Sequence, residues 1–103
     1  MTQPLVFITG ASSGIGQALA ARYARDGWRL ALVARRAPEI DAWARTQGFA
    51  PGQFAVYSGD VSQTASILAA AESCIATQGQ PDVVIANAGI SVGMDTAVLS
   101  DID

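Results

Sequence analysis

The hydrophobic residues fall into short continuous runs that alternate with longer stretches of helical spacing. Continuous apolar runs predict strands buried on both faces, whereas a spacing of three or four residues predicts amphipathic helices. The predicted strands cover residues 5–8, 30–33, 54–57 and 83–86. The stretches between them predict helices from Gly14 to near Gly27, from Pro38 to Gly48 and from Ser62 to Gly79. The chain therefore has a βαβα order.

Each predicted helix has end signals and one apolar face. Pro38 suits the first turn of a helix, Ser62 is a candidate N-cap, and a glycine follows each helix where a C-terminal stop is expected. The side chains expected to pack on the sheet are Ile15, Ala18, Leu19 and Tyr23 in the first helix, Ile40, Trp43 and Ala44 in the second, and Ile67, Leu68, Ala71 and Ile75 in the third.

Parallel-type strands that alternate with helices predict an α/β fold, the first half of a doubly wound parallel (Rossmann) sheet. We interpret residues 1–103 as one incomplete dinucleotide-binding half-domain, truncated after about the fourth strand. In the usual strand order the fourth strand lies beside the first and has a fifth strand beyond it. The segment from Ser91 to Asp103 is polar and weakly helical at best. We therefore expect no fifth strand and an unpaired edge at residues 83–86. Unless another chain supplies the missing strand, we expect the isolated chain to be marginally stable, self-associating or partly disordered after Gly89.

Composition excludes several classes of function. Half of the residues are hydrophobic and 15% are charged, which argues against disorder. A net charge of −3, with no lysine among the six basic residues, argues against nucleic acid as a partner. The absence of histidine and lysine excludes histidine acid–base catalysis, lysine Schiff bases and the common histidine metal sites. We predict no metal centre.

The single cysteine and the length of the apolar runs indicate the compartment. Cys74 permits no internal disulfide, and its place in an apolar helical stretch predicts a buried thiol in a reducing environment. No apolar run approaches the roughly 20 residues that span a bilayer. The first residues also lack the basic flank of a signal peptide. We expect a cytoplasmic protein without a membrane partner.

A glycine-rich turn stands between the first strand and the first helix, with the spacing G-x-x-x-G-x-G over Gly10, Gly14 and Gly16. Glycines there allow a tight turn, bring backbone N–H groups to a phosphate and direct a helix N-terminus at its charge. Ser12 and Ser13 add hydroxyl groups, and Ile15 completes the turn. A P-loop is excluded because it requires lysine. Glycine content alone leaves a methyltransferase-like or flavodoxin-like site, or a tight structural loop, open.

The sequence TGASSGIG, from Thr9 to Gly16, resembles the cofactor turn of the classical short-chain dehydrogenases/reductases. Two further motifs agree in order and distance. Asp60 and Val61 after the third strand resemble the pair that contacts adenine in that family. Asn87, Ala88 and Gly89 after the fourth resemble its N-A-G motif near the cofactor ribose. Taken singly, Asp60 could be a helix-start residue and the N-A-G sequence an ordinary turn, but in register with the predicted strands they are specific.

The end of the second strand bears on the choice of cofactor. A carboxylate there binds the ribose 2′-hydroxyl of NAD, whereas arginine accommodates the 2′-phosphate of NADP. This strand ends in Ala34, Arg35 and Arg36, so the carboxylate is absent and a guanidinium follows at once. NADP is therefore favoured over NAD, although Arg36 could simply point to solvent. The resemblance implies that Ser12 contacts the same phosphate.

The resemblance implies hydride transfer between a nicotinamide and a small-molecule carbonyl or alcohol, by a serine and a Tyr-x-x-x-Lys pair. This chain has no lysine, and its tyrosines, Tyr23 and Tyr57, fall in a predicted helix and strand. We assign no catalytic residue here, and interpret the chain as the cofactor-binding half of such an oxidoreductase. The resemblance also implies a homo-oligomer at full length. The alternatives are a stand-alone, non-catalytic nucleotide-binding or interaction module and an unrelated nucleotide-binding domain.

Overall fold

A computed structural model describes residues 3–87 and 96–98. In chain order its elements are β1 (Leu5–Thr9), α1 (Gly14–Arg25), β2 (Arg29–Ala34), α2 (Ala37–Thr46), β3 (Phe54–Ser58), α3 (Thr64–Thr77), β4 (Val83–Asn87) and β5 (Thr96–Val98). The expected βαβα order is confirmed for β1 to β4, and each strand reaches one residue or more beyond its predicted run. Within the described residues, no helix is long and apolar enough to cross a membrane.

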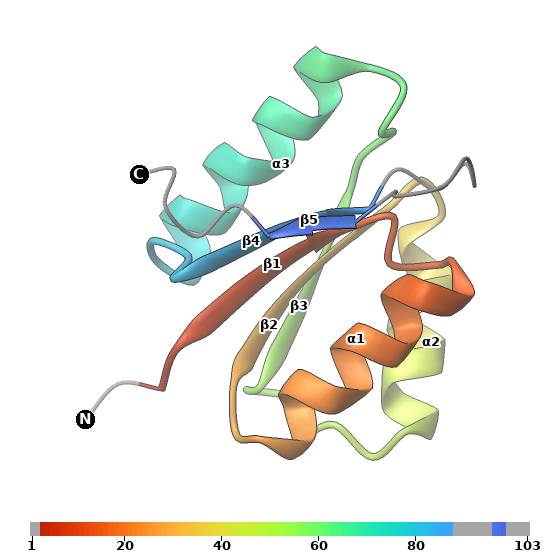
Figure 1. Ribbon diagram of the computed structural model, residues 1–103, viewed down its shortest axis with the longest axis vertical. Coiled ribbons are helices and arrows are strands. Elements are labelled where there is room, and N and C mark those ends of the chain that lie inside the picture. Colours follow the sequence, from red (N-terminus) through yellow and green to blue (C-terminus); the bar gives the residue numbers. More distant parts are fainter. Residues whose placement is uncertain (1–2, 88–95, 99–103) are drawn as a thin grey trace.

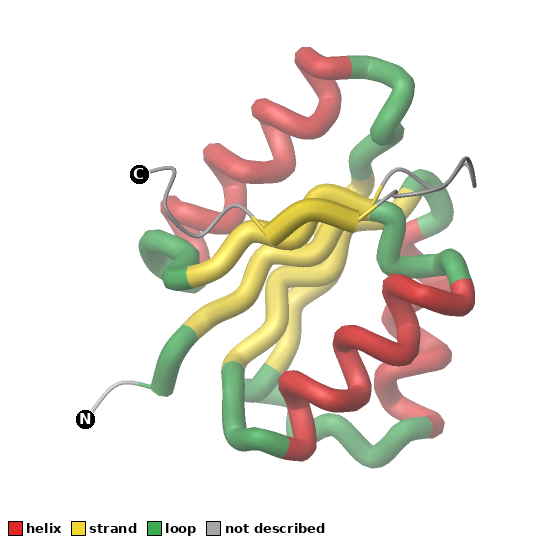
Figure 2. Tube along the Cα trace, viewed as in Figure 1, coloured by secondary structure: helices red, strands yellow, loops and turns green. Residues whose placement is uncertain are grey.

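The strands form one sheet in the order β3-β2-β1-β4-β5 (Figures 1 and 2). β1 pairs in parallel with β2 and with β4, and β2 pairs in parallel with β3. This is the predicted half of a doubly wound sheet. Parallel strands need crossover connections, and the helices that provide them cover both faces of the sheet. α1 and α2 lie on one face and α3 lies on the other (Figure 1).

The expectation that no fifth strand would follow is wrong. β5 pairs antiparallel with β4, with Ile85 opposite Val98 and Asn87 opposite Thr96. A parallel fifth strand needs a crossover of a dozen or more residues, whereas an antiparallel strand needs only a short connection. Eight residues, 88–95, separate β4 from β5. β5 therefore pairs with the edge of β4 that the sequence predicted to be open.

The apolar side chains form one core on each face of the sheet. On the side of α1 and α2, the buried residues include Ile8, Leu32, Ile40 and Ala44. On the side of α3, Phe7 and Val33 pack against Ala70 and Cys74. The predicted burial of Ile40, Ala44 and the Cys74 thiol is confirmed, and Trp43 packs at the edge of the first core.

Two predicted helix faces differ from the structure. In α1 the buried residues are Gly16 and Ala20, while Leu19 and Tyr23 pack at the edge of the core and Ile15 is 53% exposed. The predicted inward orientation of Ile15 and Ala18 is therefore wrong. Two small residues of the helix, Gly16 and Ala20, make the close contact with the sheet.

In α3 the residues that face the sheet are Ala70 and Cys74, with Ile67 and Ala71 half-buried beside them. Leu68 and Ile75, which were expected on the buried face, are 58% and 48% exposed. α3 is apolar on nearly every side, so periodicity could not select its inward face. The small side chains allow the closest approach of the helix to the sheet, and this places the larger ones outside.

Candidate functional site

The candidate residues gather at one edge of the sheet. The carboxyl ends of the parallel strands meet there, with Thr9 in register with Val33, and Ala34 in register with Ser58. The residues that follow these ends are Gly10, Ser12, Ser13, Gly14, Ile15 and Gly16 after β1, Arg35 and Arg36 after β2, Asp60 and Val61 after β3, and Asn87 at the end of β4. Ala88 and Gly89 lie outside the described residues. In open α/β sheets this edge is where ligands bind.

The glycine-rich turn has the backbone that the sequence predicted. Gly10 has a φ of +63°, a left-handed conformation that a residue with a side chain rarely adopts. The Ala11 N–H donates to the Val33 carbonyl over 2.9 Å, which ties the turn to β2. Ser13 is the N-cap of α1: its hydroxyl accepts a 2.9 Å hydrogen bond from the Gly16 N–H. The turn is therefore held from both sides.

The N-terminus of α1 can accept an anion. The first amides of a helix have no intrahelical acceptor, and a helix N-terminus carries partial positive charge. Ser13 satisfies the Gly16 amide, which leaves those of Gly14 and Ile15 without an intrahelical acceptor. The first turn of α1 contains no acidic residue. Ser12 is exposed beside it, and a Cβ on Gly14 would meet nothing within 4 Å. The arrangement fits a phosphate group.

The two arginines after β2 differ in their partners. Arg36 pairs with Glu39 over 3.2 Å on the exposed surface of α2. Arg35 is exposed, and it makes no hydrogen bond or ion pair with any residue in 3–87 or 96–98. Ala34 before it is buried and carries no charge. The guanidinium of Arg35 is thus the group at this strand end that can bind an added anion.

Asp60 is held by its neighbours in the turn before α3. One carboxylate oxygen accepts hydrogen bonds from the Ser62 N–H at 2.9 Å and the Ser62 hydroxyl at 2.8 Å. These bonds lower the pKa of Asp60 below its ordinary value, and the charge of Arg35 lowers it further. The carboxylate is therefore ionised at neutral pH. The prediction that Ser62 is the N-cap of α3 is wrong: Gln63 takes that position, and Ser62 turns back to Asp60.

Sequence reasoning missed two residues that shape this turn. Gly59 is buried against β2, and its N–H donates to the Ala34 carbonyl over 3.1 Å. The Ser66 hydroxyl accepts a 3.0 Å hydrogen bond from the Asp60 N–H. A serine two residues after an aspartate is a local signal for the Asp60–Ser62 bonds. No local pattern reveals the roles of Gly59 and Ser66, because both residues act through contacts with other elements.

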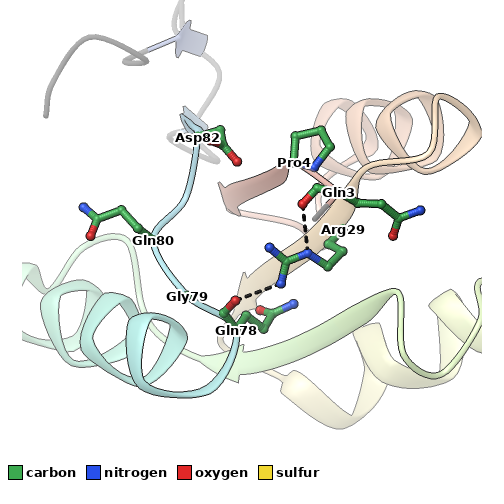
Figure 3. A pocket seen from close by; sticks show the side chains of 7 residues that line it. All are labelled: Gln3, Pro4, Arg29, Gln78, Gly79, Gln80 and Asp82. Atoms are coloured by element: carbon green, nitrogen blue, oxygen red, sulfur yellow. Dashed lines mark hydrogen bonds between the residues drawn. The ribbon is translucent and has the colours of Figure 1, made fainter. Parts of the chain in front are cut away.

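A hollow of about 400 Å³ lies at the opposite edge of the sheet, where the strands begin (Figure 3). Its two charged side chains, Arg29 and Asp82, already have partners within the chain. The Arg29 guanidinium donates to the Gln3 carbonyl at 3.1 Å and to the Gln78 carbonyl at 2.8 Å. The Asp82 carboxylate accepts a hydrogen bond from the Leu5 N–H at 2.9 Å. These bonds fasten the ends of elements together, so the carboxyl edge is the better candidate for a ligand site.

The strand order and the glycine turn define a Rossmann-type α/β sheet, and the helix N-terminus at its carboxyl edge has a geometry that fits a phosphate group. The sequence model of a family described as short chain dehydrogenase matches residues 4–103. The chain therefore belongs to the short chain dehydrogenase family, and the resemblance found in its motifs is confirmed.

Individual relatives agree with this assignment. A D-threitol dehydrogenase from Mycolicibacterium smegmatis is 37% identical over 84% of this chain and 34% of its own length. L-Sorbose reductase from Gluconobacter frateurii, solved with NADPH and L-sorbose, is 30% identical with a TM-score of 0.76, over 94% of this chain and 38% of that one. A 3-ketoacyl-(acyl-carrier-protein) reductase from Brucella melitensis, solved with NADH, is 28% identical with a TM-score of 0.68, over 79% of this chain and 32% of that one.

The chain spans about a third of the length of the curated relatives that it matches. The part of the chain that the family model matches carries β1 to β4 and the edge described above. These two solved relatives contain different nicotinamide nucleotides, NADPH in one and NADH in the other. The choice between these cofactors therefore has to be argued from the residues of this chain.

Proposed function

We propose that residues 1–103 are the cofactor-binding half of an NADPH-dependent oxidoreductase that acts on a carbonyl or alcohol substrate. The observation that carries the choice of cofactor is Arg35, exposed and unpaired within the described residues, directly after the uncharged Ala34. A carboxylate in place of Ala34 would repel the 2′-phosphate, whereas a guanidinium binds it. The relatives solved with nicotinamide nucleotides support a cofactor of this class.

The residues at the carboxyl edge would each bind a different part of the cofactor. The Gly14 and Ile15 amides at the start of α1 would receive the pyrophosphate, with Gly10 and Gly16 giving the turn its shape. Ser12 and Arg35 would receive the 2′-phosphate, and Arg36, which is paired with Glu39, would add positive charge beside it. Asp60 and Val61 would contact the adenine, and the Asn87–Gly89 motif would lie near a ribose. The bound cofactor supplies hydride chemistry, and the chain supplies binding and orientation.

The substitution Arg35→Ala tests the choice of cofactor. A hydrogen bond to a charged group contributes roughly 1.5–3 kcal/mol, so its loss should weaken binding of 2′,5′-ADP about tenfold to a hundredfold. Binding of 5′-AMP, which lacks the 2′-phosphate, should barely change. Ala34→Asp should act in the same direction by placing a carboxylate against the phosphate. Calorimetry or ligand-observed NMR measures both nucleotides without turnover.

Arg25→Ala is the matched control, because it removes one exposed arginine from the last turn of α1, at the other end of that helix. It should leave the affinity for both nucleotides unchanged. Equal affinity of the folded wild-type chain for the two nucleotides would contradict the NADP proposal. So would an Arg35→Ala variant that weakens both nucleotides alike, and either result would return NAD to consideration.

A further inference from the structure

The turn after β3 lies closer to β2 than a residue with a side chain would allow. A Cβ atom on Gly59 would stand 2.7 Å from Val33 Cγ1, 3.4 Å from Ile67 Cδ1 and 3.6 Å from Ala70 Cβ. A separation below 3.0 Å requires something to move. Val33 cannot move easily, because its β-branched side chain is stiff and fully buried in the core beneath α3. Glycine at position 59 is therefore a requirement of packing.

Backbone conformation does not explain this glycine. The described glycines with positive φ are Gly10, Gly27, Gly48 and Gly79, and Gly59 is not among them. Alanine could adopt the backbone at position 59 without strain. The requirement is for space alone, so removing atoms from Val33 should relieve it.

The contact between Gly59 and Val33 lies beside two residues of the candidate site, Asp60 and Arg35. Gly59 directly precedes Asp60, and its N–H is bonded to the carbonyl of Ala34, which directly precedes Arg35. Asp60 is then fixed from the α3 side by Ser66, which accepts its N–H. The bond between Gly59 and Ala34 therefore holds Asp60 and Arg35 on adjacent strand ends. Their separation thus depends on how closely Gly59 approaches Val33.

We propose that Gly59 is a positioning residue of the nucleotide site: its contact with Val33 sets the separation between Asp60 and Arg35. Since these two residues are assigned to the adenine and to the 2′-phosphate of one adenosine group, a fixed separation matches them to a single rigid ligand. This inference rests on the proposed function. A side chain at position 59 would move Asp60 away from β2 and separate the two halves of the adenosine site.

The test uses the variants Gly59→Ala, Val33→Ala and the double variant in the 103-residue chain. Gly52→Ala is the matched control, because Gly52 lies in the exposed turn before β3, where a Cβ would meet nothing within 4 Å. Two quantities are measured on folded samples. One is the affinity for 5′-AMP and 2′,5′-ADP by calorimetry. The other is the pKa of the Asp60 carboxyl, by carboxyl-carbon NMR, which reports its position relative to Ser62 and Arg35.

Gly59→Ala should weaken both nucleotides about tenfold, the loss of roughly one good hydrogen bond. It should also raise the pKa of Asp60 by the part that Arg35 contributes, because Ser62 moves together with Asp60. The double variant should restore both quantities to those of Val33→Ala, and Gly52→Ala should match the wild type. If Gly59→Ala does not fold, the double variant must still fold and match Val33→Ala. A role in packing alone would lower stability while leaving the pKa of Asp60 and the affinities unchanged.

The inference is overturned if folded Gly59→Ala keeps the wild-type affinities and pKa of Asp60, or if the double variant does not recover those of Val33→Ala. Failure of the proposed function gives a different result. In that case the wild-type chain binds neither nucleotide, while the pKa of Asp60 still responds to Gly59→Ala and recovers in the double variant. The two failures are therefore distinguishable in one set of samples.

Discussion

At the scale of single residues, Gln78 connects the end of α3 with β2 and β3. Its side-chain amide donates to the Leu30 carbonyl on β2 at 3.0 Å and accepts a 2.8 Å hydrogen bond from the Tyr57 hydroxyl on β3. Its backbone carbonyl accepts from Arg29 at the start of β2. Gln78 is the C-cap of α3, so these bonds fasten the end of that helix to the sheet.

The Tyr57 hydroxyl makes the stability of the chain sensitive to high pH. Burial raises the pKa of Tyr57 to about 12, and the neighbouring Cys74 adds to this shift. In the unfolded chain this tyrosine ionises at about pH 10. The neutral hydroxyl therefore contributes its full stabilisation below pH 10, and that stabilisation is lost as the pH rises toward 12. The variant Tyr57→Phe lacks this fall in stability at high pH. It also lacks a hydrogen bond that contributes about 1 kcal/mol.

Urea unfolding of both proteins from pH 8 to pH 12 measures this effect. At pH 8 the wild type should be more stable than Tyr57→Phe by about 1 kcal/mol. The difference should narrow as the pH rises above 10. The pKa of Cys74 is also raised by burial, and that thiol is present in both proteins, so each of them includes its titration. A difference that stays constant up to pH 12 would show that the Tyr57 hydroxyl ionises normally.

At the scale of elements, α3 differs from the other two helices. Glu72 is the one charged residue in its sequence TASILAAAESCIAT, and apolar residues occur on every side. Only one face of α3 packs on the sheet, which leaves Leu68 and Ile75 largely exposed seven residues apart, on the same side of the helix. Exposed apolar surface of this kind mediates contact between molecules.

We therefore expect the isolated chain to self-associate through α3, in place of the strand edge that the sequence suggested. Replacing both Leu68 and Ile75 by Gln should shift the sedimentation of concentrated samples toward that of a monomer. Ala65→Gln is the control, because Ala65 is exposed on the same helix without a large apolar side chain. A wild-type chain that stays monomeric at every concentration tested would contradict this expectation.

At the scale of the whole molecule, the two edges of the sheet differ in the groups that they present to a ligand. The amino edge is closed by bonds within the chain, such as those of Arg29 and Asp82. The carboxyl edge presents amides and the guanidinium of Arg35 to an added ligand. The resemblance to the family assigns proton transfer to a tyrosine with a nearby lysine. This chain has no lysine, Tyr23 packs at the edge of the core, and the Tyr57 hydroxyl is hydrogen-bonded to Gln78.

We therefore predict that the 103-residue chain binds 2′,5′-ADP but does not reduce aldehydes or ketones with NADPH. The measurement follows absorbance of the reduced nicotinamide over a panel of carbonyl compounds. Binding of 2′,5′-ADP in the same sample shows that the site is folded. Oxidation of NADPH that accompanies the protein through purification and is lost in Arg35→Ala would contradict the prediction that this chain contains no catalytic residue.

The sequence by itself determined the order and type of β1 to β4 and of the three helices. Continuous apolar runs and helical spacing are local properties, and so are turn signals such as Gly10 and Pro38. It also located the candidate edge, because residues that follow parallel strands must meet at one end of a sheet. The resemblance of its motifs to a family was sufficient to identify that family.

Only the tertiary structure decided which atoms meet. The inward face of α3 depended on how closely Ala70 and Cys74 approach the sheet, which the pattern of an apolar helix does not contain. The pairing of β5 with β4 depended on an edge left free by the rest of the sheet. The requirement for Gly59 came from Val33, which is 26 residues earlier in the chain but is in contact with it in space. Local patterns follow from local physics, whereas contacts between distant residues are set by packing.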